Sequence, residues 1–180
     1  MTQAQNNSIV KRGIVSGLIV TVIVFPGLYF LLPHFSHELD LLKRLQLGIS
    51  CLVFPGLFLL VLILRIGSQR FGNVSEDPTE VIADSRAMKI DLRVLSNSHE
   101  QVMLFVINTL GLAVLLPFSY LSLLPIYSGL FVIGRVSFWA GYRHHVLWRA
   151  PGFALTVLPA LVGLSYCGAV LLVRIGELWS

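Results

Sequence analysis

Charged residues and cysteines are scarce in this sequence. Asp, Glu, Lys and Arg make up 12% of the 180 residues, whereas 56% are hydrophobic. Soluble domains contain about 25% and about 45–50% of these classes, so a freely soluble globular enzyme is excluded. The two cysteines, Cys51 and Cys167, lie in the middle of separate apolar tracts, without the spacing of a zinc site or a disulfide framework. We interpret both as small core residues.

The histidines do not form a metal-binding pattern. His144 and His145 are adjacent, and neighbouring residues on a helix point about 100° apart. No third ligand has a matching spacing, so we expect no metal site.

The few charges leave four uncharged tracts, at residues 13–32, 45–64, 101–134 and 150–173. A helix needs about 20 residues to cross the roughly 30 Å apolar core of a bilayer, so three of these tracts fit one span each. The tract at 101–134 is too long for one span. Pro117, followed by Ser119, Ser122 and Pro125, predicts a turn that divides it into two helices. The sequence therefore predicts an all-α integral membrane protein with five transmembrane helices.

The first tract is interpreted as an uncleaved anchor. It is longer than the apolar region of a signal peptide, about 7–15 residues, and it continues to Pro33 without a cleavage pattern. We expect residues 1–12 to form a polar tail, disordered over 1–8, and residues 13–33 to form an additional span. Residues 34–44 would be a non-cytoplasmic loop, and residues 45–180 a four-helix domain with a polar loop at 67–84.

Basic residues lie mainly on one side of these five spans. The positive-inside rule predicts a cytoplasmic N-terminus and a C-terminus outside or in a lumen. The membrane would be a bacterial inner membrane or one of the endoplasmic reticulum type. This asymmetry accounts for the net charge of +4 without a nucleic-acid partner. The predicted cytoplasmic group is Lys11, Arg12, Arg65, Arg70, Arg86, Lys89, Arg143 and Arg149, and the opposite group is Lys43, Arg44 and Arg174.

A short repeat, Val-Phe-Pro-Gly-Leu, occurs at residues 24–28 and 53–57. Five residues are too few to indicate duplication of a whole unit. We interpret each copy as a kinked or thinned part of a helix that a neighbouring helix fills.

Polar residues in or beside apolar helices are functional candidates, because burying them without a partner is expensive. Arg93, Asn97 and Glu100 are spaced i, i+4 and i+7, which places them on one stripe of the third span, in its cytoplasmic half. A second set keeps one helical face if the fourth helix continues as far as Arg149. This second set is Arg135, Phe138, Tyr142 and Arg149.

A pocket between the two stripes would contain guanidiniums that bind carboxylates, a carboxylate that binds ammonium, an amide and a phenol. This set suits a zwitterionic small molecule with several carboxylates. The spacing is equally compatible with a structural role, in which Glu100 pairs with Arg93 or Arg135 and the Tyr142 and Arg149 side chains anchor the helix at the interface. A transporter is disfavoured, because the stripes stop at one interface.

The spacing Arg93-x-x-x-Asn97-x-x-Glu100, followed by Gly134-Arg135, Tyr142 and Arg149-Ala150-Pro151, resembles the MAPEG family of membrane glutathione-dependent enzymes. The resemblance covers about residues 59–173, including the stretch from Arg70 to Asp77. It implies a MAPEG-like four-helix bundle in a homotrimer, with glutathione bound between adjacent subunits near the cytosolic face. The segment 13–33 would be an additional N-terminal helix, as in five-span members.

The resemblance also implies residue roles. Arg93, Asn97 and Glu100 would bind the glutathione backbone, and Arg135 and Tyr142 would bind it from the next helix. Arg149 would stabilise the thiolate and so be the catalytic residue. The glycine end of glutathione would be reached by Arg70 or Arg65. Phe138 belongs to the same binding set, at a position where some members have Tyr or His, and residue 101 is Gln where several have Tyr.

The implied function is that of a glutathione transferase or peroxidase acting on lipophilic electrophiles or lipid hydroperoxides. Its partners would be glutathione as co-substrate, a lipid or other lipophilic small molecule, and the bilayer. The additional helix, Gln101 and Phe138 favour an alternative: a non-catalytic protein of the MAPEG fold that binds lipid or regulates partner membrane proteins in signalling or trafficking.

Overall fold

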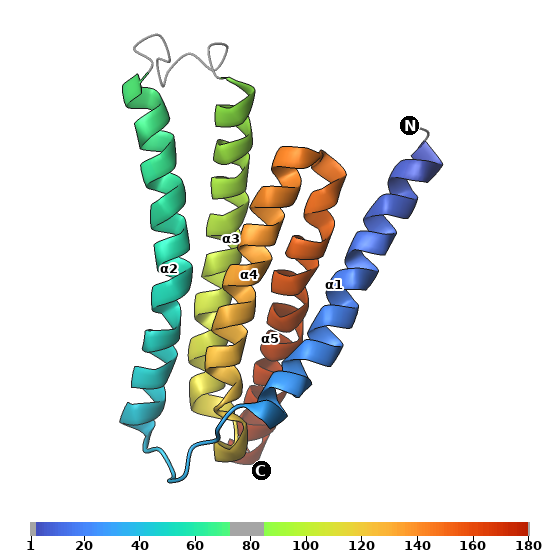
Figure 1. Ribbon diagram of the computed structural model, residues 1–180. Coiled ribbons are helices and arrows are strands. Elements are labelled where there is room, and N and C mark those ends of the chain that lie inside the picture. The colour runs from blue at the N-terminus through green and yellow to red at the C-terminus, as the bar shows by residue number, and fades with distance from the viewer. Residues whose placement is uncertain (1–2, 73–84, 180) are drawn as a thin grey trace.

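The computed structural model describes residues 3–72 and 85–179, and this part of the chain is helical almost throughout (Figure 1). Five helices are long and apolar enough to cross a membrane, which confirms the predicted all-α membrane architecture. They are α1 (Gln3–Leu31), α2 (Leu41–Gly72), α3 (Arg86–Leu115), α4 (Leu123–His144) and α5 (Ala150–Leu178), with two short 3₁₀ helices, η1 (Phe118–Tyr120) and η2 (Val146–Arg149).

The turn predicted in the long apolar tract is present. α3 ends at Leu115, Pro117 precedes η1, and α4 begins at Leu123. Proline cannot donate the backbone hydrogen bond that would continue the helix, which explains the break.

Other predicted boundaries differ from the structure. The first helix begins at Gln3, so residues 3–8 are helical and do not form a disordered tail. α2 continues to Gly72, so residues 67–72 of the predicted loop are helical too. The remainder of that loop, residues 73–84, lies outside the described residues. Both helices extend beyond their apolar tracts because a helix can continue past the bilayer wherever no helix-breaking residue intervenes.

Successive helices run in alternating directions, so the N- and C-termini lie at opposite ends of the molecule (Figure 1). Helices α2 to α5 form a bundle, and α1 lies against α5 on the outside of it. One end of the bundle contains the end of α2, the start of α3 and the return from α4 to α5. We call it the upper end, after its place in Figure 1.

The core of the bundle is aromatic and aliphatic. The Phe105 ring of α3 packs at a tilt against the rings of Tyr127 and Phe131 of α4, with ring centroids 4.6 and 4.5 Å apart. Cys51 and Cys167 are buried and unpaired, as expected for core residues. Many large apolar side chains lie exposed on the outer faces. This is the pattern of helices surrounded by lipid, where an exposed Leu or Ile remains in an apolar medium.

The repeated Pro-Gly segments do not pack as predicted. Pro26 and Pro55 lie inside α1 and α2, but a Cβ atom at Gly27 or Gly56 would meet nothing within 4 Å. No neighbouring helix fills the space at either glycine. Gly56 is exposed and Gly27 half-buried, so each glycine borders open space within this chain, which hydropathy alone does not reveal.

Candidate functional site

A cavity of about 720 Å³ lies at the upper end of the bundle, between α1, α3, α4, η2 and α5. It brings together six of the eight residues singled out from the sequence, although they come from three separate elements. Those six are Arg93, Asn97, Glu100, Phe138, Tyr142 and Arg149.

The α3 stripe faces this cavity. Arg93, Asn97 and Glu100 all line it, together with Ser96, as the helical spacing predicts. Within residues 3–72 and 85–179, Asp91 forms ion pairs with Arg65 and Arg143, whereas Glu100 is paired with neither Arg93 nor Arg135. The alternative in which Glu100 neutralises one of these arginines is therefore not observed in the described chain.

Arg135 lies behind the cavity wall and is fully buried, with 0% of its surface exposed. Its Nη1 donates a hydrogen bond to Asn97 Oδ1 over 2.9 Å, and its guanidinium lies 4.3 Å from the centre of the Phe138 ring. Its Nε and Nη2 have no hydrogen-bond partner in the described structure. Arg135 thus holds Asn97 and Phe138 in place and adds a buried positive charge next to the cavity.

Arg149 reaches the cavity by a different route from the one predicted. The fourth helix does not continue to Arg149: α4 ends at His144, His145 is extended, and the chain returns through η2. A Cβ at Gly141 would collide with the backbone of Trp148, so the return is a close contact between α4 and η2. This turn still places the Arg149 guanidinium 5.0 Å from the centre of the Tyr142 ring.

Neither candidate for the glycine end of glutathione lines the cavity. Arg70 is exposed in the last turn of α2. Arg65 is turned toward Asp91, with its Nε 2.8 Å from Asp91 Oδ2. The structure of a single chain therefore separates both arginines from the other predicted ligands.

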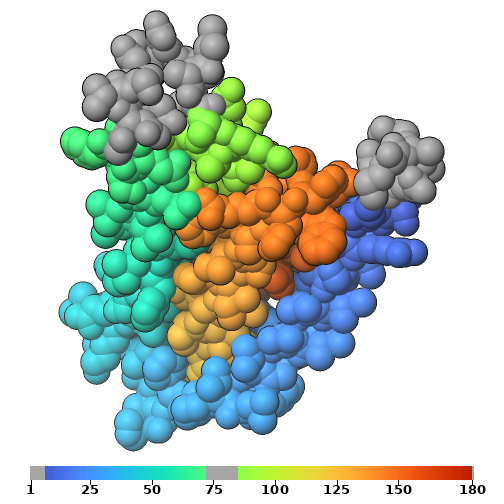
Figure 2. All heavy atoms as spheres, turned by 45° about the horizontal axis from the view of Figure 1, so that its top comes forward, coloured from blue at the N-terminus to red at the C-terminus, as the bar shows by residue number. Residues whose placement is uncertain are grey.

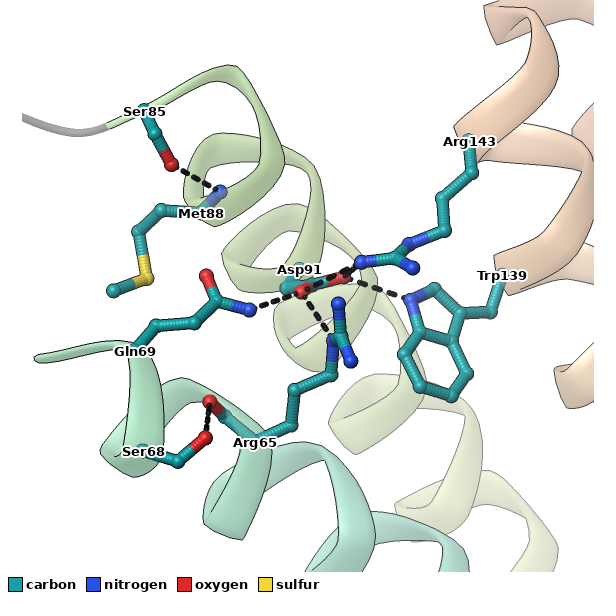
Figure 3. A network of polar contacts seen from close by, with 8 residues as sticks. All are labelled: Arg65, Ser68, Gln69, Ser85, Met88, Asp91, Trp139 and Arg143. Atoms are coloured by element: carbon teal, nitrogen blue, oxygen red, sulfur yellow. Dashed lines mark hydrogen bonds and ion pairs between the residues drawn. The ribbon is translucent and has the colours of Figure 1, made fainter. Parts of the chain in front are cut away.

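The strongest polar cluster of the described structure was not predicted. Asp91, fully buried, accepts hydrogen bonds from four side chains on two other helices (Figure 3). The one signal in the sequence is a carboxylate two residues before Arg93, in a segment that also contains Arg86 and Lys89. Helical geometry turns it about 200° away from the Arg93 stripe. The four donors are Arg65 and Gln69 of α2, and Trp139 and Arg143 of α4.

The cavity has a polar side and an apolar side. α3, Tyr142 and Arg149 supply two cations, a carboxylate, an amide and two hydroxyls, whereas α1, η2 and α5 supply aliphatic and aromatic side chains. A second, more open hollow of about 670 Å³ shares Arg93, Ser96 and Tyr142 with it and adds Arg86 and Lys89. Such a cavity can bind an anionic or zwitterionic molecule that also has an apolar part.

Among the residues that the structure describes, no three His, Cys, Asp or Glu side chains are grouped closely enough to hold a metal ion. The chemistry available at the site is that of guanidinium, carboxylate, amide and hydroxyl groups.

Comparison with known proteins adds a family and two relatives. The sequence pattern of the MAPEG family matches residues 47–169. Transmembrane protein 79 of Mus musculus is 28% identical over 157 residues, which cover 84% of this chain and 40% of that protein. The Bos taurus protein of the same name is 29% identical over 145 residues, covering 78% and 36%. The chain thus spans about two fifths of the length of these relatives. No solved structure matches.

Proposed function

The chain belongs to the MAPEG family, and we propose that it is a glutathione-dependent membrane transferase or peroxidase acting on lipophilic electrophiles or lipid hydroperoxides. One observation carries the proposal. Arg93, Glu100 and Arg149 line a single cavity without an ion-pair partner among the described residues, and the opposite wall of that cavity is apolar. All three side chains are exposed, so their charges are available to a ligand of complementary charge.

The groups of glutathione fit the charges of this cavity. Glutathione has two carboxylates, one ammonium group and one thiol. Arg93 would bind a carboxylate, Glu100 the ammonium, and Asn97 an amide of the peptide. Arg86 and Lys89, in the adjoining hollow, offer cations to the second carboxylate. Arg135 does not line the cavity and would contribute indirectly, by holding Asn97 in place.

Arg149 would activate the sulfur. An unperturbed thiol has a pKa near about 8.5 and is mostly protonated at pH 7. A guanidinium within hydrogen-bond distance favours the thiolate and lowers that pKa. The Tyr142 ring beneath Arg149 limits where the guanidinium can lie.

The thiolate would then react in one of two ways. In conjugation, it forms a bond to an electrophilic carbon while the leaving group departs with its electron pair. In peroxidase chemistry, it takes one oxygen from a hydroperoxide, which becomes an alcohol. The resulting sulfenic acid condenses with a second glutathione to give the disulfide and water.

The proposal also includes an orientation and an assembly. The upper end of the bundle would lie in the cytoplasm, where glutathione is available and where the positive-inside rule places the arginines of α2, α3 and α4. The subunits would form a homotrimer, as the family resemblance implies. In a trimer, a neighbouring subunit could supply the contact to the glycine end that Arg70 and Arg65 do not make within one chain.

The ultraviolet difference spectrum of glutathione bound to the full chain in nanodiscs at neutral pH tests the proposal without requiring a known electrophile. We expect a thiolate band that disappears in Arg149→Ala. The matched control is Arg174→Ala, because Arg174 is an exposed arginine on the other half of α5 and its removal should leave the band unchanged. If the wild type shows no thiolate band and binds no glutathione at millimolar concentration, the proposed enzymatic function is refuted.

A non-catalytic membrane protein that binds lipid or regulates partner proteins is the second candidate. It is favoured by the additional helix α1, which forms part of the cavity wall, and by similarity to relatives named only as transmembrane proteins. Gln101, a departure from the family pattern, is buried on α3 and does not line the cavity. Glutathione binding without a thiolate band and without conjugation of an aryl halide would favour this candidate.

A further inference from the structure

The additional helix α1 packs closely against α5 at two glycines. A Cβ atom at Gly13 would lie 2.8 Å from the Cβ of Ala150, and one at Gly17 would lie 2.5 Å from the Cβ of Ala154. Small residues four apart on both helices let the two backbones approach closely, which is a common means of packing helices in membranes. The first turns of α5, which follow Arg149, are therefore the surface on which α1 rests.

This packing directs one face of α1 into the cavity. Val10 and Ile14, one turn apart and beside the glycines, line the same cavity as Glu100, Tyr142 and Arg149. Leu147 of η2 and Phe153 of α5 complete the apolar wall. The opposite face of α1 carries Lys11 and Arg12 and borders a different hollow, to which Ile19 belongs.

We propose that Val10 and Ile14 of α1 form the surface that binds the lipophilic part of the second substrate. The inference rests on the proposed function, in which glutathione occupies the polar side of the cavity. A ligand whose sulfur lies at Arg149 projects its substituent away from the α3 stripe, because that stripe is occupied by the peptide. The apolar substituent then lies against α1, and the size of the accepted electrophile depends on these two side chains.

S-alkylated glutathiones test this assignment directly, because they resemble the two halves of the bound pair joined together. Calorimetric titrations in nanodiscs would compare glutathione, S-methylglutathione and S-hexylglutathione. We expect S-hexylglutathione to bind about tenfold or more tightly than S-methylglutathione, since each buried methylene contributes about 0.8 kcal/mol when fully transferred. Ile14→Ala should reduce this ratio roughly three- to tenfold and change the affinity for glutathione itself less than twofold.

Ile19→Ala is the matched control. Ile19 is the same residue type on the same helix, with 50% of its surface exposed against 45% for Ile14, but it borders the other hollow. Its substitution should leave the ratio unchanged. Gly17→Leu forces α1 away from Ala154. In protein that remains folded, it should make S-hexylglutathione and S-methylglutathione bind about equally tightly.

The outcomes separate this inference from the function on which it rests. If glutathione binds the wild type but Ile14→Ala and Ile19→Ala have equal effects on the ratio, the inference is wrong and the proposed function stands. If S-hexylglutathione binds in an Ile14-dependent manner while glutathione alone does not bind, the apolar surface is supported and the proposed function is not. If neither compound binds, both are refuted.

Discussion

Asp91 and Arg93 lie two residues apart on α3, yet the charge of Asp91 is buried and paired whereas, in the described chain, the charge of Arg93 is exposed and unpaired. Asp91 is fully buried and accepts hydrogen bonds from Arg65, Gln69, Trp139 and Arg143 (Figure 3). Arg93 is exposed and lines the cavity without an ion pair in the described chain. Removing one partner of a buried, paired charge destabilises the fold, whereas charges left unpaired around a cavity are available to a ligand.

Helical periodicity separates these two roles. A step of two residues turns the side chain about 200° around the helix axis. Asp91 therefore faces α2 and α4, where it joins the elements of the bundle, and Arg93 faces the cavity beside η2 and α1. The surface of the molecule at this end shows α1 and the segment around η2 side by side (Figure 2).

The largest effect is expected from Asp91→Ala. Removing the carboxylate eliminates both ion pairs and leaves Arg65 and Arg143 positively charged side by side against Trp139. These two arginines are 38% and 39% exposed, so water compensates part of the loss. We expect destabilisation by about 2–3 kcal/mol, measured by thermal unfolding in detergent. A variant as stable as the wild type would show that the cluster does not stabilise the fold.

Glu100→Gln should weaken glutathione binding without lowering stability, in contrast to Asp91→Ala. Because Glu100 has no ion pair in the described part of the chain, its neutralisation should leave the unfolding midpoint unchanged. It should weaken glutathione binding about tenfold, since a charge-assisted hydrogen bond to the ammonium is replaced by a neutral one. Calorimetric titration measures the affinity. Unchanged affinity with lowered stability would mean that Glu100 has a structural role after all.

Asn97→Ala tests a residue that faces the cavity and is also bonded to a buried charge. Asn97 lines the cavity and also accepts the 2.9 Å hydrogen bond from buried Arg135. Its loss should destabilise the protein by about 1 kcal/mol and weaken glutathione binding about threefold. Denaturation and binding assays on the same preparation would check both effects. If only one of them changes, Asn97 serves only one of these two roles.

Arg70→Ala should have the smallest effect. Arg70 is exposed at the end of α2 and does not line the cavity, so in a monomeric preparation the glutathione affinity should change less than twofold. A larger loss confined to oligomeric protein would indicate that Arg70 reaches the site of a neighbouring subunit. Binding measured before and after separation of the oligomers by size-exclusion chromatography distinguishes these results.

Local signals in the sequence predicted much of this molecule. Hydropathy located the helices, Pro117 located the turn, and the i, i+4, i+7 spacing placed Arg93, Asn97 and Glu100 on one face. All of these depend on residues close together in the chain. The family fingerprint added Arg149, whose contact with Tyr142 depends on the η2 return and not on a continuous helix.

The contacts that were not predicted connect distant segments. Asp91 binds side chains 22 to 52 residues away in the chain, and helix packing decides which of many possible partners it meets. Val10 and Ile14 reach the cavity only because Gly13 and Gly17 allow α1 to approach α5. Arg70 was assigned to the site from the family resemblance alone, and in a single chain the continuation of α2 holds it away.

The most direct test of the distinction between paired and unpaired charges is the effect of glutathione on thermal stability. The wild type would be compared with the double variant Arg93→Gln and Glu100→Gln, each with and without glutathione. If the cavity charges serve a ligand, glutathione raises the unfolding midpoint of the wild type by mass action. The double variant, without glutathione, is then at least as stable as the wild type and gains nothing when glutathione is added. An equal shift in both proteins, or no shift in the wild type, would contradict the account.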